Sequence, residues 1–469
     1  MNYKHAKTRL VFIAVNSSWT QSNLAFFYLR ELIRDLPYSV KMLDFTLKDH
    51  QTDALAVIMK TKPDILCFSA YIWNREYLQK LLPDLRKLLP DSVFVIGGPE
   101  MPALAELIPS SCFDRFIEGP GERAFLEQAQ AGFEGRGGYL SRPGIPLCDV
   151  PFPYKSSDKA RLSGKLVYYE TSRGCPFECV YCLSASDTRH EARFDPRDPK
   201  ALKRLHRELD ALVALEPKTV KFIDRSFNVH PALARAIWEY VISLDCACDF
   251  HFEIYPDLLS EADICLLETA PPQRIRFELG IQSTDDAINL QSRRRSDWNK
   301  GKASLHKVLQ RTQIRVHADL MLGLPQQNKA SVLKSIDQLA PLFPHEIQLG
   351  MLKILPDTPM QELAAQRDYL WQEHPPYQVL QTDLISFEQI IHLEALARVI
   401  NLYWNKGEFA DQWRTLIPKH KASKLFEALL NHHQKQDLPL HSMAKPKREL
   451  VFAAVLGPLL SSLPQSNTH

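Results

Sequence analysis

The sequence lacks an apolar stretch long enough to cross a membrane. A membrane-spanning helix needs about 20 consecutive apolar residues, and the apolar segment 451–460 is shorter and contains a proline. The chain starts MNYKHAKTRLVFIAVN, with a basic flank and a short apolar run, but no small-residue cleavage site follows. We therefore expect no signal peptide and no membrane span, and we expect the protein to be cytoplasmic.

The chain also lacks an excess of charge of either sign. The sequence contains 57 Lys and Arg and 55 Asp and Glu, so its net charge is +2. Nucleic-acid-binding domains usually carry a clear basic excess, so this balance predicts no nucleic-acid partner. The 469 residues show no internal repeat and no low-complexity tract, and their length suggests about three domains.

Disulfide bonds are not expected, although the chain has nine cysteines. The count is odd, and six of the cysteines are scattered, which in a reducing compartment is typical of small buried apolar side chains. A C-x-C pair at 246–248 has no partner pair, so we predict no metal site there. The scattered cysteines are Cys67, Cys112, Cys148, Cys246, Cys248 and Cys265.

Residues 1–135 alternate buried apolar runs with helix-like segments. This alternation predicts five β/α units in a doubly wound, Rossmann-like domain, which binds ligands at the carboxyl ends of its strands. Small and polar residues gather where these strands should end. Any one of them could simply form a turn, but their occurrence at several strand ends favours a ligand site. Residues 136–160 are rich in Gly, Pro and Ser and predict a linker. The predicted strands are 9–16, 39–45, 64–71, 93–98 and 115–119.

A second β/α series occupies residues 161–360 and predicts a partial, open (β/α)6 barrel, whose sites also lie at the strands' carboxyl ends. Residues 361–469 lack the alternation and predict a mostly helical domain, with helices at 387–407 and 423–436. His432 and His433 are adjacent in the second helix, and we expect both at the surface. The barrel strands are expected at 166–170, 219–224, 250–254, 275–280, 316–322 and 346–352.

Three cysteines stand close together in RGCPFECVYC, directly after the first barrel strand: Cys175, Cys179 and Cys182. A disulfide would leave one thiol over. Zinc prefers four ligands; His190 is a conceivable fourth, but no second C-x-x-C or H-x-x-x-H follows. An iron–sulfur cluster is held by cysteine thiolates, and three of them leave one iron of a four-iron cube open to another ligand. Gly174 and Pro176 would let the loop bend, and Tyr181 would shield the cluster from water.

The C-x3-C-x2-C spacing, with an aromatic residue before the last cysteine, resembles the radical S-adenosylmethionine (SAM) superfamily. The resemblance implies a 4Fe–4S cluster whose open iron is chelated by SAM. The reduced cluster then cleaves the C5′–S bond of SAM, and the 5′-deoxyadenosyl radical takes a hydrogen atom from the substrate.

Later segments resemble the strand motifs of this superfamily: KFIDRSFN, FHFEIYPDLLS, FELGIQSTDD, HADLMLGLPQQN and IQLGMLKILPDTPM. The usual Gly-Gly-Glu is absent, so the residue that holds the SAM amino group is not assigned. The basic segment 291–302 predicts a solvated helix start, or alternatively an anion contact through Arg293 or Arg294. The resemblance implies SAM binding by Tyr181, Asp224, Glu253, Gly280, Gln282, Ser283 and Asp319.

The first domain, with its turns FSAYIWN, IGGPEMP and EGPGERAF, resembles the cobalamin-binding class of this superfamily. Pro120 replaces the first Glu of the family's Gly-Glu-Gly-Glu. The Asp-x-His-x-x-Gly signature of other cobalamin proteins is absent, so we expect Tyr71 or Trp73, rather than a histidine, to face the lower side of cobalt. A Rossmann-like module without cobalamin is the alternative. The resemblance implies cobalamin binding by Asn16, Ser17, Ser69, Tyr71, Trp73, Gly97, Gly98, Gly119 and Gly121.

The resemblance implies a cobalamin-dependent radical SAM enzyme, in a subfamily with an uncharacterised helical C-terminal domain. The preferred interpretation is methylation of an unactivated carbon in a small-molecule or peptide substrate. We expect a low-potential electron donor such as flavodoxin or ferredoxin. The alternatives are a cobalamin-assisted cyclisation or rearrangement without methyl transfer, and a non-catalytic iron–sulfur sensor.

Overall fold

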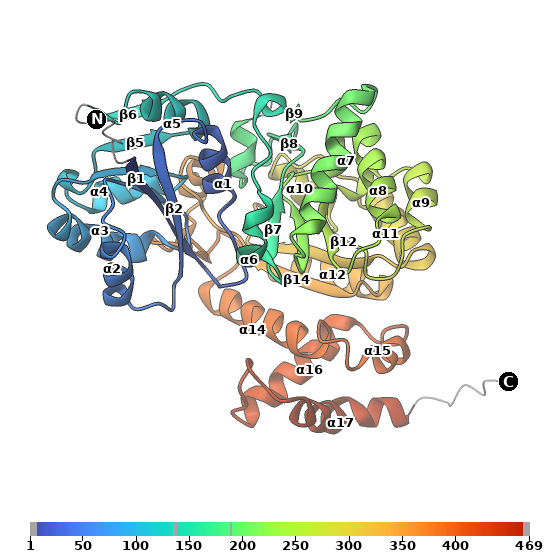
Figure 1. Ribbon diagram of the computed structural model, residues 1–469. Helices are drawn as coiled ribbons and strands as arrows, with labels where there is room; N and C mark the ends of the chain where they lie inside the picture. The colour runs from blue at the N-terminus through green and yellow to red at the C-terminus, as the bar shows by residue number, and fades with distance from the viewer. Residues whose placement is uncertain (1–6, 135–137, 188–189, 463–469) are drawn as a thin grey trace, which may run out of the picture. The chain divides into compact units, whose positions relative to one another are not determined.

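The computed structural model describes residues 7–134, 138–187 and 190–462, and the chain divides into two compact units (Figure 1). The first unit comprises Met1–Thr171, Glu191–Lys221 and Cys246–Cys248. The second comprises Ser172–His190, Phe222–Asp245 and Asp249–His469.

The first unit contains a parallel sheet with the order β2-β1-β3-β4-β5-β6. From β1 the chain builds outward to β2 on one side and to β3 on the other, so the sheet has the switch point of a doubly wound fold. The predicted Rossmann-like class is confirmed. The sheet has one strand more than predicted, β6, which lies inside the predicted linker. The strands are β1 (Thr8–Asn16), β2 (Tyr38–Thr46), β3 (Ile65–Ser69), β4 (Val93–Gly97), β5 (Arg115–Glu118) and β6 (Tyr139–Ser141).

Helices cover both faces of this sheet because alternate side chains of a strand point to opposite faces. Val11 and Ile13 of β1 belong to a core shared with α2 (Gln51–Met59), α3 (Arg75–Leu88) and α4 (Met101–Leu107). Phe12 packs instead against Phe26 of α1 (Leu24–Leu32) and Phe125 of α5 (Gly121–Gln130), with ring centroids 4.9 and 5.7 Å away. Pro83 lies within α3 without splitting it.

A second parallel sheet has the order β14-β13-β12-β11-β10-β7 and confirms the six-stranded partial barrel. The residues of β12 alternate strictly: Ile275, Phe277, Leu279 and Ile281 are buried, and the residues between them are half-buried. The apolar side packs on helices such as α8 (Pro231–Ser243), where Trp238 lies 5.7 Å from Phe277. The strands are β7 (Leu166–Tyr169), β10 (Thr219–Phe222), β11 (Asp249–Ile254), β12 (Ile275–Gln282), β13 (Arg315–Leu322) and β14 (Glu346–Met351).

Four helices form the C-terminal part of the second unit, drawn in orange to red in Figure 1. They are α14 (Phe387–Tyr403), α15 (Ala410–Leu416), α16 (Ala422–Lys435) and α17 (Lys445–Ser461). α14 ends at Tyr403, before Gly407, where the sequence predicted the stop.

The predicted surface position of His433 is wrong. Its side chain is buried, with its Nε2 2.7 Å from the Tyr403 hydroxyl, because this side of α16 packs on α14. His432, one residue earlier, is half-buried.

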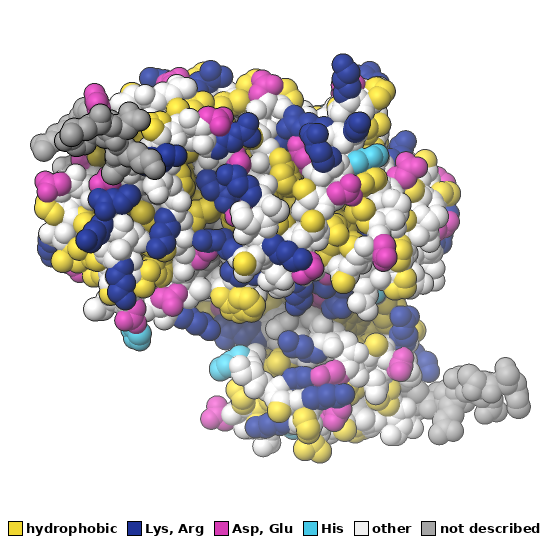
Figure 2. Space-filling view, in the orientation of Figure 1, with side chains coloured by type: hydrophobic (Ala, Val, Ile, Leu, Met, Phe, Trp, Pro, Cys, Tyr) yellow, Lys and Arg dark blue, Asp and Glu magenta, His cyan; other side chains and the backbone are white. Residues whose placement is uncertain are grey.

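No helix within the described ranges is both long and apolar enough for a bilayer span. On the face drawn in Figure 2, Lys and Arg side chains are interspersed with Asp and Glu, as the near-zero net charge leads one to expect.

Candidate functional site

The cysteine loop follows β7 and the short strand β8 (Ser172–Arg173), and backbone hydrogen bonds hold it. The Cys175 amide donates to the carbonyl of Asp187 at 2.9 Å, and the Val180 amide donates to that of Ser292 at 3.0 Å. Gly174 has a φ of +77°, and a Cβ there would meet the Asp187 carbonyl oxygen at 2.5 Å. The tight start of the loop therefore requires glycine at position 174.

The three cysteines line one cavity of about 220 Å³. Cys175 and Cys179 are buried, and Cys182 is half-buried. The same cavity is lined by five of the seven residues predicted to bind SAM: Tyr181, Glu253, Gly280, Gln282 and Asp319. The loop and the carboxyl ends of β11, β12 and β13 thus meet at one place.

The other two predicted SAM residues lie outside the cavity lining. Asp224 is buried and accepts a hydrogen bond from the Ser172 hydroxyl at 2.7 Å. Ser283 is also buried, and its hydroxyl accepts from the Asp285 amide at 3.1 Å. Asp224 thus holds the Ser172 side chain and Ser283 holds the local backbone, and the role of both residues toward SAM stays a prediction.

The donor set fits an iron–sulfur cluster better than a single metal ion. Among the described residues, no three His, Cys, Asp or Glu side chains converge on one ion position. In a four-iron cube each cysteine binds a different iron, so its thiols need not converge. His190, the conceivable zinc ligand, does not line the cavity and packs on His230, with ring centroids 4.2 Å apart.

Arg294 lines the cavity, so the expectation that segment 291–302 is a solvated helix start is wrong at this position. The side chain is 8% exposed, and its guanidinium carbon lies 4.3 Å from the centroid of the Tyr255 ring. It also donates to the carbonyl of Gly280. On its other side Tyr255 stacks on Phe177, with centroids 4.3 Å apart and planes at 21°. Cation, tyrosine and phenylalanine thus form one wall.

This wall affects the charge state of the thiols. Burial raises the pKa of Cys179 above its ordinary value, and the neighbouring Arg294 opposes that rise. Burial by itself would lower the pKa of Arg294, but Tyr181, Tyr255 and Cys179 outweigh it, so this pKa lies above its ordinary value. Arg294 is therefore a permanent cation beside thiols that must ionise to bind iron.

Beyond the cavity, the polar face of strands β11 to β14 carries a row of paired ionisable side chains. Glu278 lines the cavity and pairs with His251 at 2.9 Å. Asp319 pairs with His317 at 3.2 Å, and His317 lies 3.9 Å from Glu346. Burial would lower the pKa of His317, but the hydrogen bond to Asp319 and the surrounding carboxylates raise it overall.

In the first unit, Asn74 ties together the strand ends at the switch point. Its Nδ2 donates to the carbonyls of Val15 and Ser69, both at 3.0 Å, and its Oδ1 accepts from the Tyr71 amide at 2.8 Å. Trp73 donates through Nε1 to the same Val15 carbonyl at 3.1 Å. Asn74 belongs to the quoted FSAYIWN turn, but the sequence reasoning gave it no role.

Tyr71 and Trp73, the two residues predicted to face cobalt, form a flat surface at this edge. Their rings stack with centroids 4.4 Å apart and planes at 7°, and Trp73 is 41% exposed. Asn16 and Ser69 are buried beside them at the ends of β1 and β3. A parallel, partly exposed aromatic pair suits the face of a large planar macrocycle.

The four predicted glycines differ in their surroundings, and a Cβ at Gly97 or Gly121 would make only an ordinary contact with Ile117, at 3.4 Å. Gly98 has a φ of +99°, and a Cβ there would lie 2.4 Å from the carbonyl oxygen of Ala70. Gly119 has a φ of +69° with open space around it. Gly98 is therefore needed for the packing of the turn, and Gly119 leaves room where a ligand could approach.

Three family models match the chain in succession. The B12 binding domain covers residues 10–129, the radical SAM superfamily covers 169–339, and a protein family of unknown function, DUF4080, covers 365–448. The B12-binding and radical SAM matches together support the cobalamin-binding radical SAM family. The radical SAM match implies a 4Fe–4S cluster and SAM as cofactors, and the B12-binding match implies cobalamin.

Two of the curated relatives that the chain matches are named as methyltransferases. The chain is 26% identical over 351 residues to the cobalamin-dependent radical SAM methyltransferase TokK of Streptomyces tokunonensis, covering 64% of this chain and 48% of the relative. It is also 26% identical over 349 residues to the 2-(S-pantetheinyl)-carbapenam-3-carboxylate methyltransferase of Streptantibioticus cattleyicolor, with the same shares. The chain thus spans about half the length of these curated relatives.

Solved structures share the fold. The radical SAM methyltransferase TsrM from Kitasatospora setae, with cobalamin and a [4Fe-4S] cluster bound, superposes with a TM-score of 0.61 at 19% identity, over 76% of this chain and 75% of that one. The cobalamin-dependent SAM radical enzyme OxsB, with aqua-cobalamin and SAM bound, gives 0.67 at 11% identity, over 98% and 81%.

Proposed function

We propose that the chain is a cobalamin-dependent radical SAM methyltransferase that methylates an unactivated carbon of a small-molecule or peptide substrate. The observation that carries the proposal is the shared cavity: three cysteine thiols of one loop face the carboxyl-end side chains of three barrel strands. When bound, the reduced cluster and SAM supply a radical that abstracts hydrogen, and cobalamin supplies methyl transfer.

In this proposal the cavity residues bind and orient. Cys175, Cys179 and Cys182 hold the cluster, while Arg294 favours the ionised state of Cys179. Glu253 and Asp319 offer carboxylate oxygens to the amino group and ribose hydroxyls of SAM. Tyr181 lies in the cavity wall, where its ring would shield the cluster from water.

Cobalamin would lie at the carboxyl edge of the first sheet, over the turns that contain Tyr71, Trp73, Gly97 and Gly119. The parallel rings of Tyr71 and Trp73 would face the lower side of the corrin, without a histidine ligand to cobalt. The open space at Gly119 would leave room for the ring and its substituents.

The domain boundaries remain part of the proposal: 1–135 for cobalamin, 136–160 as a linker, 161–360 for the radical SAM core and 361–469 as the helical domain. A low-potential donor such as flavodoxin or ferredoxin would reduce the cluster, and neither nucleic acid nor a membrane would take part. We place the reaction in the cytoplasm.

The test is anaerobic reconstitution of the full chain with iron, sulfide, cobalamin, SAM labelled in its methyl group, and a chemical reductant. We expect about four irons per chain, 5′-deoxyadenosine, and label on the bound cobalamin. Cys179→Ala should lose iron and 5′-deoxyadenosine, whereas Cys265→Ala, at an exposed cysteine outside the cavity, should lose neither.

The results separate the alternatives. Full iron in Cys179→Ala, or no 5′-deoxyadenosine from any preparation, would refute the proposal. SAM cleavage without label on cobalamin would refute methyl transfer and favour a cyclisation or rearrangement.

A further inference from the structure

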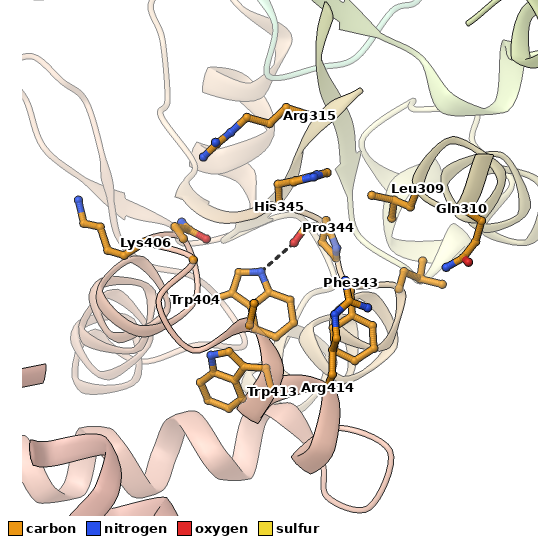
Figure 3. Close-up of a pocket in the computed structure, with 14 residues that line it drawn as sticks. Leu309, Gln310, Arg315, Phe343, Pro344, His345, Trp404, Lys406, Trp413 and Arg414 are labelled. Atoms are coloured by element: carbon orange, nitrogen blue, oxygen red, sulfur yellow. Dashed lines mark hydrogen bonds between the residues drawn. The ribbon is translucent and has the colours of Figure 1, made fainter. Parts of the chain in front are cut away.

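A second groove, of about 350 Å³, lies in the second unit at the amino ends of β13 and β14 (Figure 3). Its lining includes Arg315, the first residue of β13, and His345, which directly precedes β14. The cysteine cavity is reached by the same strand β13 through Asp319, four residues after Arg315. At about 3.3 Å per residue the two positions lie roughly 13 Å apart along the strand, so the groove and the cavity are separate sites. Its volume is within the range of small-molecule sites, about 300–1,000 Å³.

Aromatic side chains form the floor of this groove. Trp404 is buried and donates through Nε1 to the carbonyl of Pro344 at 3.0 Å, so its indole is fixed. Phe343 lies nearly parallel to it, with centroids 6.0 Å apart and planes at 11°. Phe343 also has a left-handed φ of +56°, which is uncommon for a bulky residue and is often found at binding sites.

Basic side chains surround this floor: Arg315, His345, Lys406 and Arg414. No Asp or Glu belongs to the described lining. Nε and Nη2 of Arg315 both donate to Glu346 Oε1, at 3.0 and 2.8 Å, which orients the guanidinium. Arg414 lies 5.1 Å from the centroid of the Phe343 ring, and within the described chain neither Arg414 nor Lys406 forms an ion pair.

His345 adds a directed donor to this set. Its Nδ1 accepts a hydrogen bond from the Val316 amide at 3.1 Å, so the neutral ring carries its proton on Nε2. Burial lowers the pKa of His345, Arg315 and Arg414 lower it further, and Glu346 opposes them. Both arginines are therefore close enough to act on the same imidazole, one from each side of the groove, as Figure 3 shows.

We propose that this basic groove binds a small organic anion, whose carboxylate or phosphate head contacts the basic side chains and whose flat apolar body packs on Phe343 and Trp404. Arginine is suited to such heads because its planar fork matches carboxylate and phosphate oxygens. The proposal goes beyond methyl transfer and does not depend on it, since none of the groove residues lines the cofactor cavity.

The test is isothermal titration calorimetry of the full holoenzyme under anaerobic conditions, with four probes. Benzoate and phenyl phosphate combine a ring with an anionic head, benzyl alcohol has the ring alone, and inorganic phosphate has the head alone. We expect benzoate, phenyl phosphate or both to bind with a Kd of about 1 mM or lower, and benzyl alcohol and inorganic phosphate to bind at least about tenfold more weakly.

Two variants assign the site. Arg414→Gln should weaken the best probe at least about tenfold, because a charged hydrogen bond is lost. Arg398→Gln, an exposed arginine of α14 outside the groove, should not change the Kd. Lys406→Gln provides a second groove variant if Arg414→Gln does not fold, and all variants should retain the iron content of the wild type.

Every outcome decides the proposal. Tighter binding of benzoate supports a carboxylate ligand, and tighter binding of phenyl phosphate supports a phosphate ligand. The absence of saturable binding, equal affinity for benzyl alcohol, or an unchanged Kd in a folded groove variant would overturn it.

Discussion

The guanidinium of Arg294 lies 4.3 Å from the ring of Tyr255, and the two residues form one wall of the cysteine cavity. They are 39 positions apart in the sequence, and the register of the barrel strands has to be correct for them to meet. The wall combines a buried cation with an aromatic face, an arrangement that stabilises positive charge in a desolvated site.

Replacement of this cation is expected to disturb the cofactor site and not the whole fold. In Arg294→Gln the cation–π contact and the bond to the Gly280 carbonyl are lost, so we expect 5′-deoxyadenosine formation to fall at least about tenfold. Arg293→Gln, at the exposed preceding residue, is the matched control. Chromatographic quantification of 5′-deoxyadenosine and an iron assay check this; wild-type values in Arg294→Gln would contradict it.

Gly98 is expected to be sensitive even to replacement by alanine. The new Cβ would lie 2.4 Å from the Ala70 carbonyl oxygen at a φ of +99°, so Gly98→Ala should lower the free energy of unfolding by about 1–3 kcal/mol. Cobalamin retention should fall with it, because the turn is adjacent to the proposed corrin site.

Gly457→Ala is the control for this substitution. It lies in α17 with open space around its Cα, so alanine there should be neutral or stabilise the helix by up to about 1 kcal/mol. Thermal unfolding followed by circular dichroism compares the two variants; equal melting temperatures would show that the turn between β4 and α4 tolerates a side chain.

His433 is expected to make the helical C-terminal part sensitive to acid. Burial lowers its pKa in the folded protein, although the Leu438 carbonyl opposes this. As pH falls, the unfolded chain therefore takes up a proton at this histidine before the folded protein does. The contribution of His433 to the free energy of unfolding is complete above about pH 6.5 and is lost as pH falls below it.

A variant isolates this effect. His433→Gln should unfold with a smaller dependence on pH between about 7 and 5 than the wild type, although it is less stable at pH 7 because the bond to Tyr403 changes. His432→Gln, at the half-buried neighbour, should keep the wild-type slope. Urea unfolding at several pH values measures these slopes, and identical slopes in His433→Gln and the wild type would rule out this assignment.

The strands were predictable because fully buried parallel strands are continuous apolar runs. The observed β1 and β4 differ from their predicted ranges by a single residue at one end. The cysteine loop was predictable because its spacing is local. In contrast, the burial of Arg294 depends on Tyr255, and that of His433 on Tyr403, 30 positions away. Contacts between distant segments leave no periodic pattern in the sequence. A basic segment or a pair of histidines is therefore predicted to lie at the surface.

One face of β13 connects the two sites of the second unit. Asp319 lines the cysteine cavity and Arg315 lines the basic groove, while His317 lies between them and contacts both Asp319 and Glu346. Because Glu346 in turn pairs with Arg315, three ionic contacts lie where branched apolar side chains fill an ordinary barrel interior. The charged groups from Arg315 to Asp319 are therefore electrostatically coupled. The protonation of His317 responds to charge introduced in the groove or in the cavity.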